Sequence, residues 1–184
     1  TLLPAGAPGN KYSFVANIDS IAPVILHTQL PNQFRETWPV MAKAKVTDNI
    51  GVDSVKVWYK VKFNGTLKMF TLAAGDENMY SGMFNSDSSQ VALGDTLYYR
   101  VEAKDASTMA NRGYAPSANG WYTFQFVGDN TQPVVIHMPL RDQPRLRWPA
   151  KVEAGLLDTL GISSATVEYY KNLPANSNNF ALLN

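Results

Sequence analysis

The sequence predicts an all-β protein made of antiparallel β-sandwich modules in tandem. Three observations predict this fold class: short runs that alternate apolar and polar residues, turn residues between these runs, and a self-similarity with a period of about 110 residues. The chain has 184 residues, of which 45% are hydrophobic, so it has enough apolar material for packed cores.

The repeat aligns residues 23–74 with residues 133–184 without a gap, and the same offset places residues 12–14 on residues 122–124. We therefore expect residues 1–19 to be the last strand of a preceding module, residues 20–129 one complete module, and residues 130–184 the first half of a following module. Identical pairs include His27 with His137, Leu30 with Leu140, Trp38 with Trp148, Pro39 with Pro149, Asp48 with Asp158, Val57 with Val167 and Tyr59 with Tyr169.

The first strands of the complete module are expected at residues 24–27 and 40–46, which are rich in apolar and β-branched residues. Residues 54–62 follow and alternate strictly, which predicts a strand with one face toward the core. The inward set is Val55, Val57, Tyr59 and Val61, and the outward set is Lys56, Trp58, Lys60 and Lys62.

Four more strands complete the expected seven of a two-sheet sandwich: residues 67–72, 79–84, 96–104 and 121–126. The third of these alternates as regularly as residues 54–62. Its inward set is Leu97, Tyr99, Val101 and Ala103, and its outward set is Arg100, Glu102 and Lys104.

Turn residues separate these runs at residues 48–51, at Asn64-Gly65 and at residues 93–95. The linkers at residues 18–23 and 128–133 are short and end in proline, so we expect semi-rigid joints between successive modules. Neighbouring modules of the same chain are therefore the first partners that the sequence predicts.

Composition excludes several functional classes. Lys plus Arg is 16 against 15 for Asp plus Glu, so the chain lacks the positive field that binds nucleic acid. No apolar run approaches the roughly 18 residues of a membrane span, so no membrane insertion is expected. The absence of Cys excludes disulfides, thiolate metal sites and Cys nucleophiles, but it does not fix the compartment.

Residues 94–105 (GDTLYYRVEAKD) and residues 46–55 (VTDNIGVDSV) resemble segments of bacterial Ig-like or fibronectin type III-like repeats. This resemblance extends over nearly the whole chain, but its motifs are loose and identify a superfamily. It implies a β-sandwich fold and a place in a tandem array of a secreted, extracellular or cell-surface protein. Such repeats occur in exported peptidases, other hydrolases and surface proteins.

The repeat weakens two candidate sites. His27 and His137 are the only histidines, and they occupy equivalent positions without a local nucleophile or metal-ligand companion, so a structural role is expected. Trp38 and Trp148 could stack on sugars, but their recurrence favours packing at the end of a sandwich, where the indole N–H finds a carbonyl partner. No catalytic residue is predicted.

Trp58 differs from these residues because its counterpart is Glu168 and its predicted direction is outward. We expect a patch around it that binds a protein or a glycan. The predicted patch consists of Trp58, Lys56, Lys60, Tyr98 and Arg100.

Oxygen ligands in loops and at module junctions could converge on Ca²⁺. No segment has the dense carboxylates of an EF-hand loop, and Asp and Asn are common turn residues, so no cofactor is assigned. The residues concerned are Asp48, Asn49, Asp105, Asp129 and Asn130.

Three functional hypotheses remain open at this level. The first is a non-catalytic spacer or interaction module of a larger exported protein, and the second is the accessory portion of a secreted hydrolase such as a peptidase. The third is a subunit of an extracellular filament that assembles by strand donation at an open sheet edge. We favour the first.

Overall fold

The described residues form an all-β structure, and its short helical segments are single 3₁₀ turns. The structure is a computed structural model that describes residues 16–170 and 177–182. It divides into two compact units between Gly128 and Asp129, which we call unit 1 and unit 2. The expected strand around residues 12–14 lies outside the described residues.

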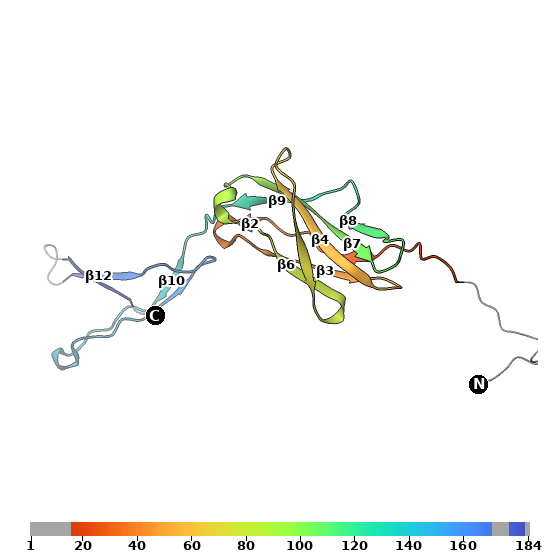
Figure 1. The fold of residues 1–184 in the computed structure, drawn as a ribbon. Helices are drawn as coiled ribbons and strands as arrows, with labels where there is room; N and C mark the ends of the chain where they lie inside the picture. The colour runs from red at the N-terminus through yellow and green to blue at the C-terminus, as the bar shows by residue number, and fades with distance from the viewer. Residues whose placement is uncertain (1–15, 171–176, 183–184) are drawn as a thin grey trace, which may run out of the picture. The chain divides into compact units, whose positions relative to one another are not determined.

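Unit 1 contains nine strands (Figure 1). Eight of them pair along one path, in the order β1-β3-β6-β5-β4-β7-β9-β2, and β8 pairs with β7 beside this path. Three 3₁₀ turns connect them: η1 (Arg35–Thr37), η2 (Asp76–Asn78) and η3 (Ser88–Gln90). The strands are β1 (Val24–Leu26), β2 (Gln33–Phe34), β3 (Met41–Thr47), β4 (Val52–Val61), β5 (Lys68–Ala74), β6 (Met79–Met83), β7 (Thr96–Asp105), β8 (Arg112–Ala115) and β9 (Tyr122–Val127).

The sheet is continuous because β5 takes part in two pairings. Its first residues, Lys68–Leu72, pair with β4, and its last two, Ala73 and Ala74, pair with β6. All pairings are antiparallel except that of β2 with β9, which is parallel, so the sheet is mixed. The sheet curls around an apolar interior, as the ribbon shows (Figure 1).

The long strands β4 and β7 lie side by side at the centre of this sheet. The predicted inward set is confirmed for both strands, because the side chains named for it are fully buried, apart from the partly buried Val61. Alternation with a period of two places these side chains on one face, since successive residues of a strand point to opposite sides.

Aromatic rings fill the end of the interior. Phe84 lies 5.0 Å from Trp38, 5.1 Å from Tyr59 and 6.0 Å from Tyr99, measured between ring centroids. Trp38 is only 5% exposed, which agrees with the packing role that its recurrence predicted. The expectation for its indole N–H was wrong, because Nε1 is buried and has no hydrogen-bond partner among the described residues.

Two strands of unit 1 were not predicted, β2 and β8, so the expected count of seven was too low. Strand β8 also explains why the predicted exposure of Glu102 was wrong. Glu102 was expected to point into solvent but is 8% exposed, because Arg112 of β8 pairs with its carboxylate. The short run around Gly113 alternates too little to predict a strand from the sequence.

Unit 2 contains two hairpins and the 3₁₀ turn η4 (Arg145–Arg147). Strand β10 (Val134–His137) pairs with β11 (Ala154–Leu157), and β12 (Thr166–Tyr170) pairs with β13 (Ser177–Ala181). In the backbone register, Val134 is paired with Leu157 as Val24 is with Thr47, and Val167 is paired with Phe180 as Val57 is with Phe70. Both hairpins therefore have the registers of their counterparts in unit 1.

Replacing Phe84 with alanine should destabilise unit 1 by about 3–5 kcal/mol, because it removes a ring from a closely packed interior. The matched control is Phe63→Ala, since Phe63 is 65% exposed, and this change should cost less than about 1 kcal/mol. Urea unfolding followed by circular dichroism would give both values. Equal losses would contradict the packing described for Phe84.

Candidate functional site

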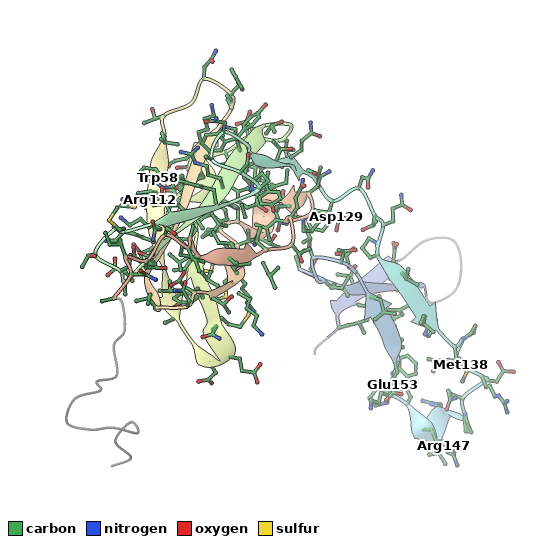
Figure 2. The ribbon with its side chains drawn as sticks, turned by 90° about the vertical axis from the view of Figure 1, so that its right-hand side faces the viewer. Trp58, Arg112, Asp129, Met138, Arg147 and Glu153 are labelled. Atoms are coloured by element: carbon green, nitrogen blue, oxygen red, sulfur yellow. The ribbon has the colours of Figure 1, made fainter. Side chains whose placement is uncertain are left out.

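All five residues of the predicted patch lie on one face of the sheet. Across the β4–β7 pair, Trp58 is opposite Arg100, Lys60 is opposite Tyr98, and Lys56 is opposite Glu102. We call this surface the cation–aromatic face and define it as the five predicted residues together with Trp121. Trp58 is labelled in Figure 2, on the strand that carries half of this face.

Trp121 is the member of this face that sequence reasoning missed. Lys60 Nζ lies 5.1 Å from its ring centroid and Arg100 Cζ lies 5.0 Å from it, so the indole is flanked by two cations. The electron-rich face of an indole attracts cations at such distances. One signal could have found it: a shift by one repeat period places it on Lys11, so this Trp, like Trp58, is not repeated.

Further rings hold the two cations in place. Lys60 Nζ lies 4.4 Å from the ring of Phe63 and 5.6 Å from that of Tyr98. Arg100 Cζ lies 5.8 Å from the ring of Tyr114, and the guanidinium also donates a hydrogen bond to the carbonyl of Ala118. These contacts fix the direction of both positive charges without neutralising them.

Most other cations of unit 1 near this face have an acidic partner. Lys104 pairs with Asp53 at 2.8 Å, Lys62 pairs with Asp95 at 3.3 Å, and Arg112 pairs with Glu102. Among the residues that the structure describes, no carboxylate forms an ion pair with Lys56, Lys60 or Arg100. The face therefore combines flat apolar rings with the unpaired positive charges of Lys60 and Arg100, whereas Lys56 lies within electrostatic reach of Asp53.

Two donors at the centre of the face have no acceptor. Nε1 of Trp58 and Nε of Arg100 are each buried without a hydrogen-bond partner in the described part of the chain. The side chains themselves are half-buried, and Met69 of β5 lies opposite Trp58 on the other side. The rings and cations of the face that remain accessible, rather than these two buried donors, suit a ligand with negative charge and a flat apolar surface.

His27 belongs to a different environment, between the two halves of the sheet. Its Nδ1 donates to the carbonyl of Lys43 at 2.6 Å, so Nε2 is free to accept a hydrogen bond from the Tyr99 hydroxyl at 2.9 Å. The same hydroxyl accepts a bond from the backbone N–H of Leu30 at 2.8 Å. This network is satisfied by a neutral imidazole with its proton on Nδ1.

The protonation of this network follows from its burial. Desolvation lowers the pKa of His27, and the hydrogen bond to the Lys43 carbonyl only partly opposes this effect. Burial raises the pKa of the Tyr99 hydroxyl to about 12, so that hydroxyl remains a donor near neutral pH. The contacts give His27 a structural task in the interior.

Three carboxylates lie close together where the chain enters unit 1. Single oxygens of Asp19, Asp48 and Asp105 lie within 4.8 Å of one another, so these are the described residues that could hold a divalent cation. Of the residues weighed for calcium, Asp48 and Asp105 are thus brought together, and Asn49 donates to Asp19 at 3.1 Å. The other two, Asp129 and Asn130, belong to unit 2.

Hydrogen bonds account for much of this cluster. The side-chain amide of Asn111 donates to Asp105 Oδ2 at 2.8 Å and to the Asp19 carbonyl at 3.2 Å. Burial opposes ionisation of the fully buried Asp105, but hydrogen bonds from Asn111 and Ser107 outweigh it and hold the pKa of Asp105 below its ordinary value. The hydrogen bonds from Asn49 and Asn111 therefore hold Asp19, a linker residue, against the loops of unit 1.

No protein-family model and no curated protein matches this chain. Within the described ranges, no helix has the length and apolar character needed to span a membrane.

Lowering the pH from 7.5 to 5.5 should decrease the free energy of unfolding through His27. The unfolded chain has the ordinary pKa of about 6.5 and the folded chain a lower one, so the unfolded state binds more protons as the pH falls through 6.5. One proton limits the slope to about 1.4 kcal/mol per pH unit.

A His27→Gln variant should reduce this pH dependence, whereas His137→Gln in unit 2 should leave that of unit 1 unchanged. Urea midpoints at several pH values, read from probes in unit 1, would measure both. An unaltered pH dependence in the His27→Gln variant would contradict the neutral, half-buried imidazole.

Proposed function

We propose that the chain is a non-catalytic piece of a tandem array of Ig-like or fibronectin type III-like β-sandwich modules in a larger secreted or cell-surface protein. In this role the modules act as a spacer and as an interaction surface. The proposal depends on one observation above the others: equivalent residues make the same local contacts in unit 1 and in unit 2, one repeat period apart.

These shared contacts involve both side chains and backbone. His27 Nδ1 contacts the Lys43 carbonyl at 2.6 Å, and His137 Nδ1 contacts the Glu153 carbonyl at 2.9 Å. His27 and His137 are one repeat period apart in the sequence, and so are Lys43 and Glu153. The side-chain amides of Gln33 and Gln143 and the carboxylates of Asp48 and Asp158 also repeat their bonds.

The clamp at Asp19 supports the spacer role. A linker residue whose carboxylate and carbonyl are both bonded to the loops of a module restricts the direction in which the preceding chain enters. Its counterpart Asp129 accepts a hydrogen bond from the N–H of Thr131 at 2.8 Å, as Asp19 does from Ile21 at 3.2 Å. Restricted joints are what an array needs to hold another domain at a distance.

Two alternatives, an accessory portion of a hydrolase and a filament subunit, assign the same modules to a different kind of parent protein. An accessory portion of a secreted hydrolase, such as a peptidase, would use the same modules beside a catalytic domain elsewhere in the sequence. A filament subunit would use the open edge of unit 2 to accept a strand from another chain.

The protein isolated from its native source should be larger than the 20.3 kDa of this sequence and should contain further copies with the same period. Intact mass measurement and sequencing of both termini would test this. A catalytic domain in the flanking sequence would favour the hydrolase alternative. An intact chain with only the mass of this sequence would contradict the proposal and favour the filament alternative.

A second role is favoured by the cation–aromatic face, which is suited to an acidic partner. Lys60 and Arg100 are oriented by aromatic rings and lack carboxylate partners among the described residues. Flat rings beside fixed positive charge can bind a polysaccharide that contains uronic acids, because its rings stack and its carboxylates pair with the cations. We propose such a glycan as the ligand class.

Affinity electrophoresis in gels containing polygalacturonate should retard the chain, and Trp121→Ala or Arg100→Ala should weaken binding roughly five- to tenfold, about 1–1.4 kcal/mol. Lys104→Ala is the matched control, since it removes a cation from the same strand whose charge is already paired with Asp53. Dextran, a neutral polysaccharide, should cause no retardation. Equal effects of Arg100→Ala and Lys104→Ala would indicate nonspecific charge attraction and contradict this site.

A further inference from the structure

A hollow on the outside of unit 1 lies beside the part of β3 that β1 does not reach. Strand β1 pairs only with residues 45–47 of β3, so the earlier residues of β3 have no partner on this edge among the described strands. The chain leaves the sheet at His27, whose Nδ1 donates to the Lys43 carbonyl at 2.6 Å. The space that remains has a volume of about 280 Å³.

Aliphatic and thioether side chains supply most of the lining. Leu26, Lys45 and Met79 form one row across β1, β3 and β6, because Leu26 is paired with Lys45 and Lys45 with Met79. Met41 lies on the same side of β3, since exposed and buried positions alternate along this strand. Leu30 completes the lining from the loop after β1. The hollow thus offers an apolar surface without a Phe, Tyr or Trp ring.

Two lysines give the hollow a positive rim. Lys43 and Lys45 are exposed, line the hollow and lie two residues apart on the outer side of β3. Asp76 and Glu77 of η2 come shortly before Met79 in the sequence, but no described carboxylate forms an ion pair with either lysine. A carboxylate ligand would gain a charge-assisted hydrogen bond from these ammonium groups. The rim therefore favours an anionic ligand.

The positive rim is specific to unit 1. One repeat period places Lys43 on Glu153 and Lys45 on Gly155, so both charges are missing from the equivalent positions of unit 2. The corresponding strand pair nevertheless forms there, with the same register. Neither lysine is therefore needed for the strand pairing, and both can be replaced in a test of binding.

We propose that this hollow binds an aliphatic carboxylate, a free fatty acid of short or medium chain length. The alkyl chain lies on the two leucines and the two methionines, and the carboxylate pairs with Lys43 or Lys45. Methionine suits an alkyl chain, because its thioether side chain is flexible and polarizable. The volume of about 280 Å³ suits a small ligand, since sites for drug-sized molecules have roughly 300–1,000 Å³. The site belongs to unit 1 alone, so binding there requires neither the tandem array nor the cation–aromatic face.

Methionine methyl groups report on the hollow directly, because Met41 and Met79 line it and the other methionines do not. Hexanoate titrated into the chain with ¹³C-labelled methionine methyls should move the signals of Met41 and Met79, with a Kd on the order of 1–10 mM. The signals of Met109 and Met138 should keep their positions. Met41→Leu and Met79→Leu variants assign the two signals. Hexanoate that leaves both signals in place, or moves all methionine signals alike, overturns the proposal.

Hexanol and the rim lysines test the role of the charge. Hexanol has the same alkyl chain without the carboxylate and should bind at least about threefold more weakly. Lys43→Gln together with Lys45→Gln should weaken hexanoate binding at least about fivefold and leave hexanol binding unchanged. The matched control is Lys62→Gln with Lys104→Gln, which removes two cations that already have acidic partners. Equal effects of the two double variants, or equal affinities for hexanol and hexanoate, would show that the rim does not hold the carboxylate.

The same signals identify a different occupant of the hollow. Movement of the Met41 and Met79 signals with protein concentration alone would assign the hollow to a second copy of the chain. Tighter binding of the peptide acetyl-Asp-Leu-Asp-amide than of hexanoate would assign it to an acidic protein partner. Either result rules out a fatty acid as the ligand.

Discussion

The hydroxyl of Tyr99 is the constraint on which the interior of unit 1 depends. It extends from the central strand β7 across the core and holds both His27 and the backbone of Leu30. A buried hydroxyl without partners would be costly, so the segment after β1 must lie where it can complete these bonds. This interaction joins two parts of the curled sheet that are about 70 residues apart in the sequence.

Alternation along each strand made much of this fold predictable, whereas pairing between distant strands did not. The pattern of β4 and β7 assigned their inward residues correctly, because strand geometry fixes the side of each residue. Strand β8 escaped prediction because tertiary contact defines it: a Cβ on Gly113 would lie 2.0 Å from the Pro23 carbonyl oxygen. The burial of Glu102 escaped with it, since Arg112 of that strand is its partner.

In the candidate site, too, the direction of each side chain was predictable and the pairing between strands was not. Outward residues of each strand could be identified from the sequence, but only the β4–β7 register places Trp58 beside Arg100 and Lys60 beside Tyr98. Trp121 begins the strand predicted at residues 121–126, but the sequence does not show that this strand pairs with β7, and that pairing brings Trp121 to this face. Asp48 and Asp105 of the acidic cluster were among the residues weighed for calcium, but Asp19 was missed, because three distant segments supply the carboxylates.

The two units share local hydrogen bonds and strand registers but differ in the residues on the outer face. Trp58 corresponds to Glu168, and Lys56 corresponds to Thr166, so the charge that suits an acidic ligand in unit 1 is absent from the same strand of unit 2. An acidic glycan would therefore distinguish one module from the other even though both have the same strand registers. Such a division is physically simple, because the two faces of a strand can change independently: one face is constrained by packing and the other only by what it meets in solution.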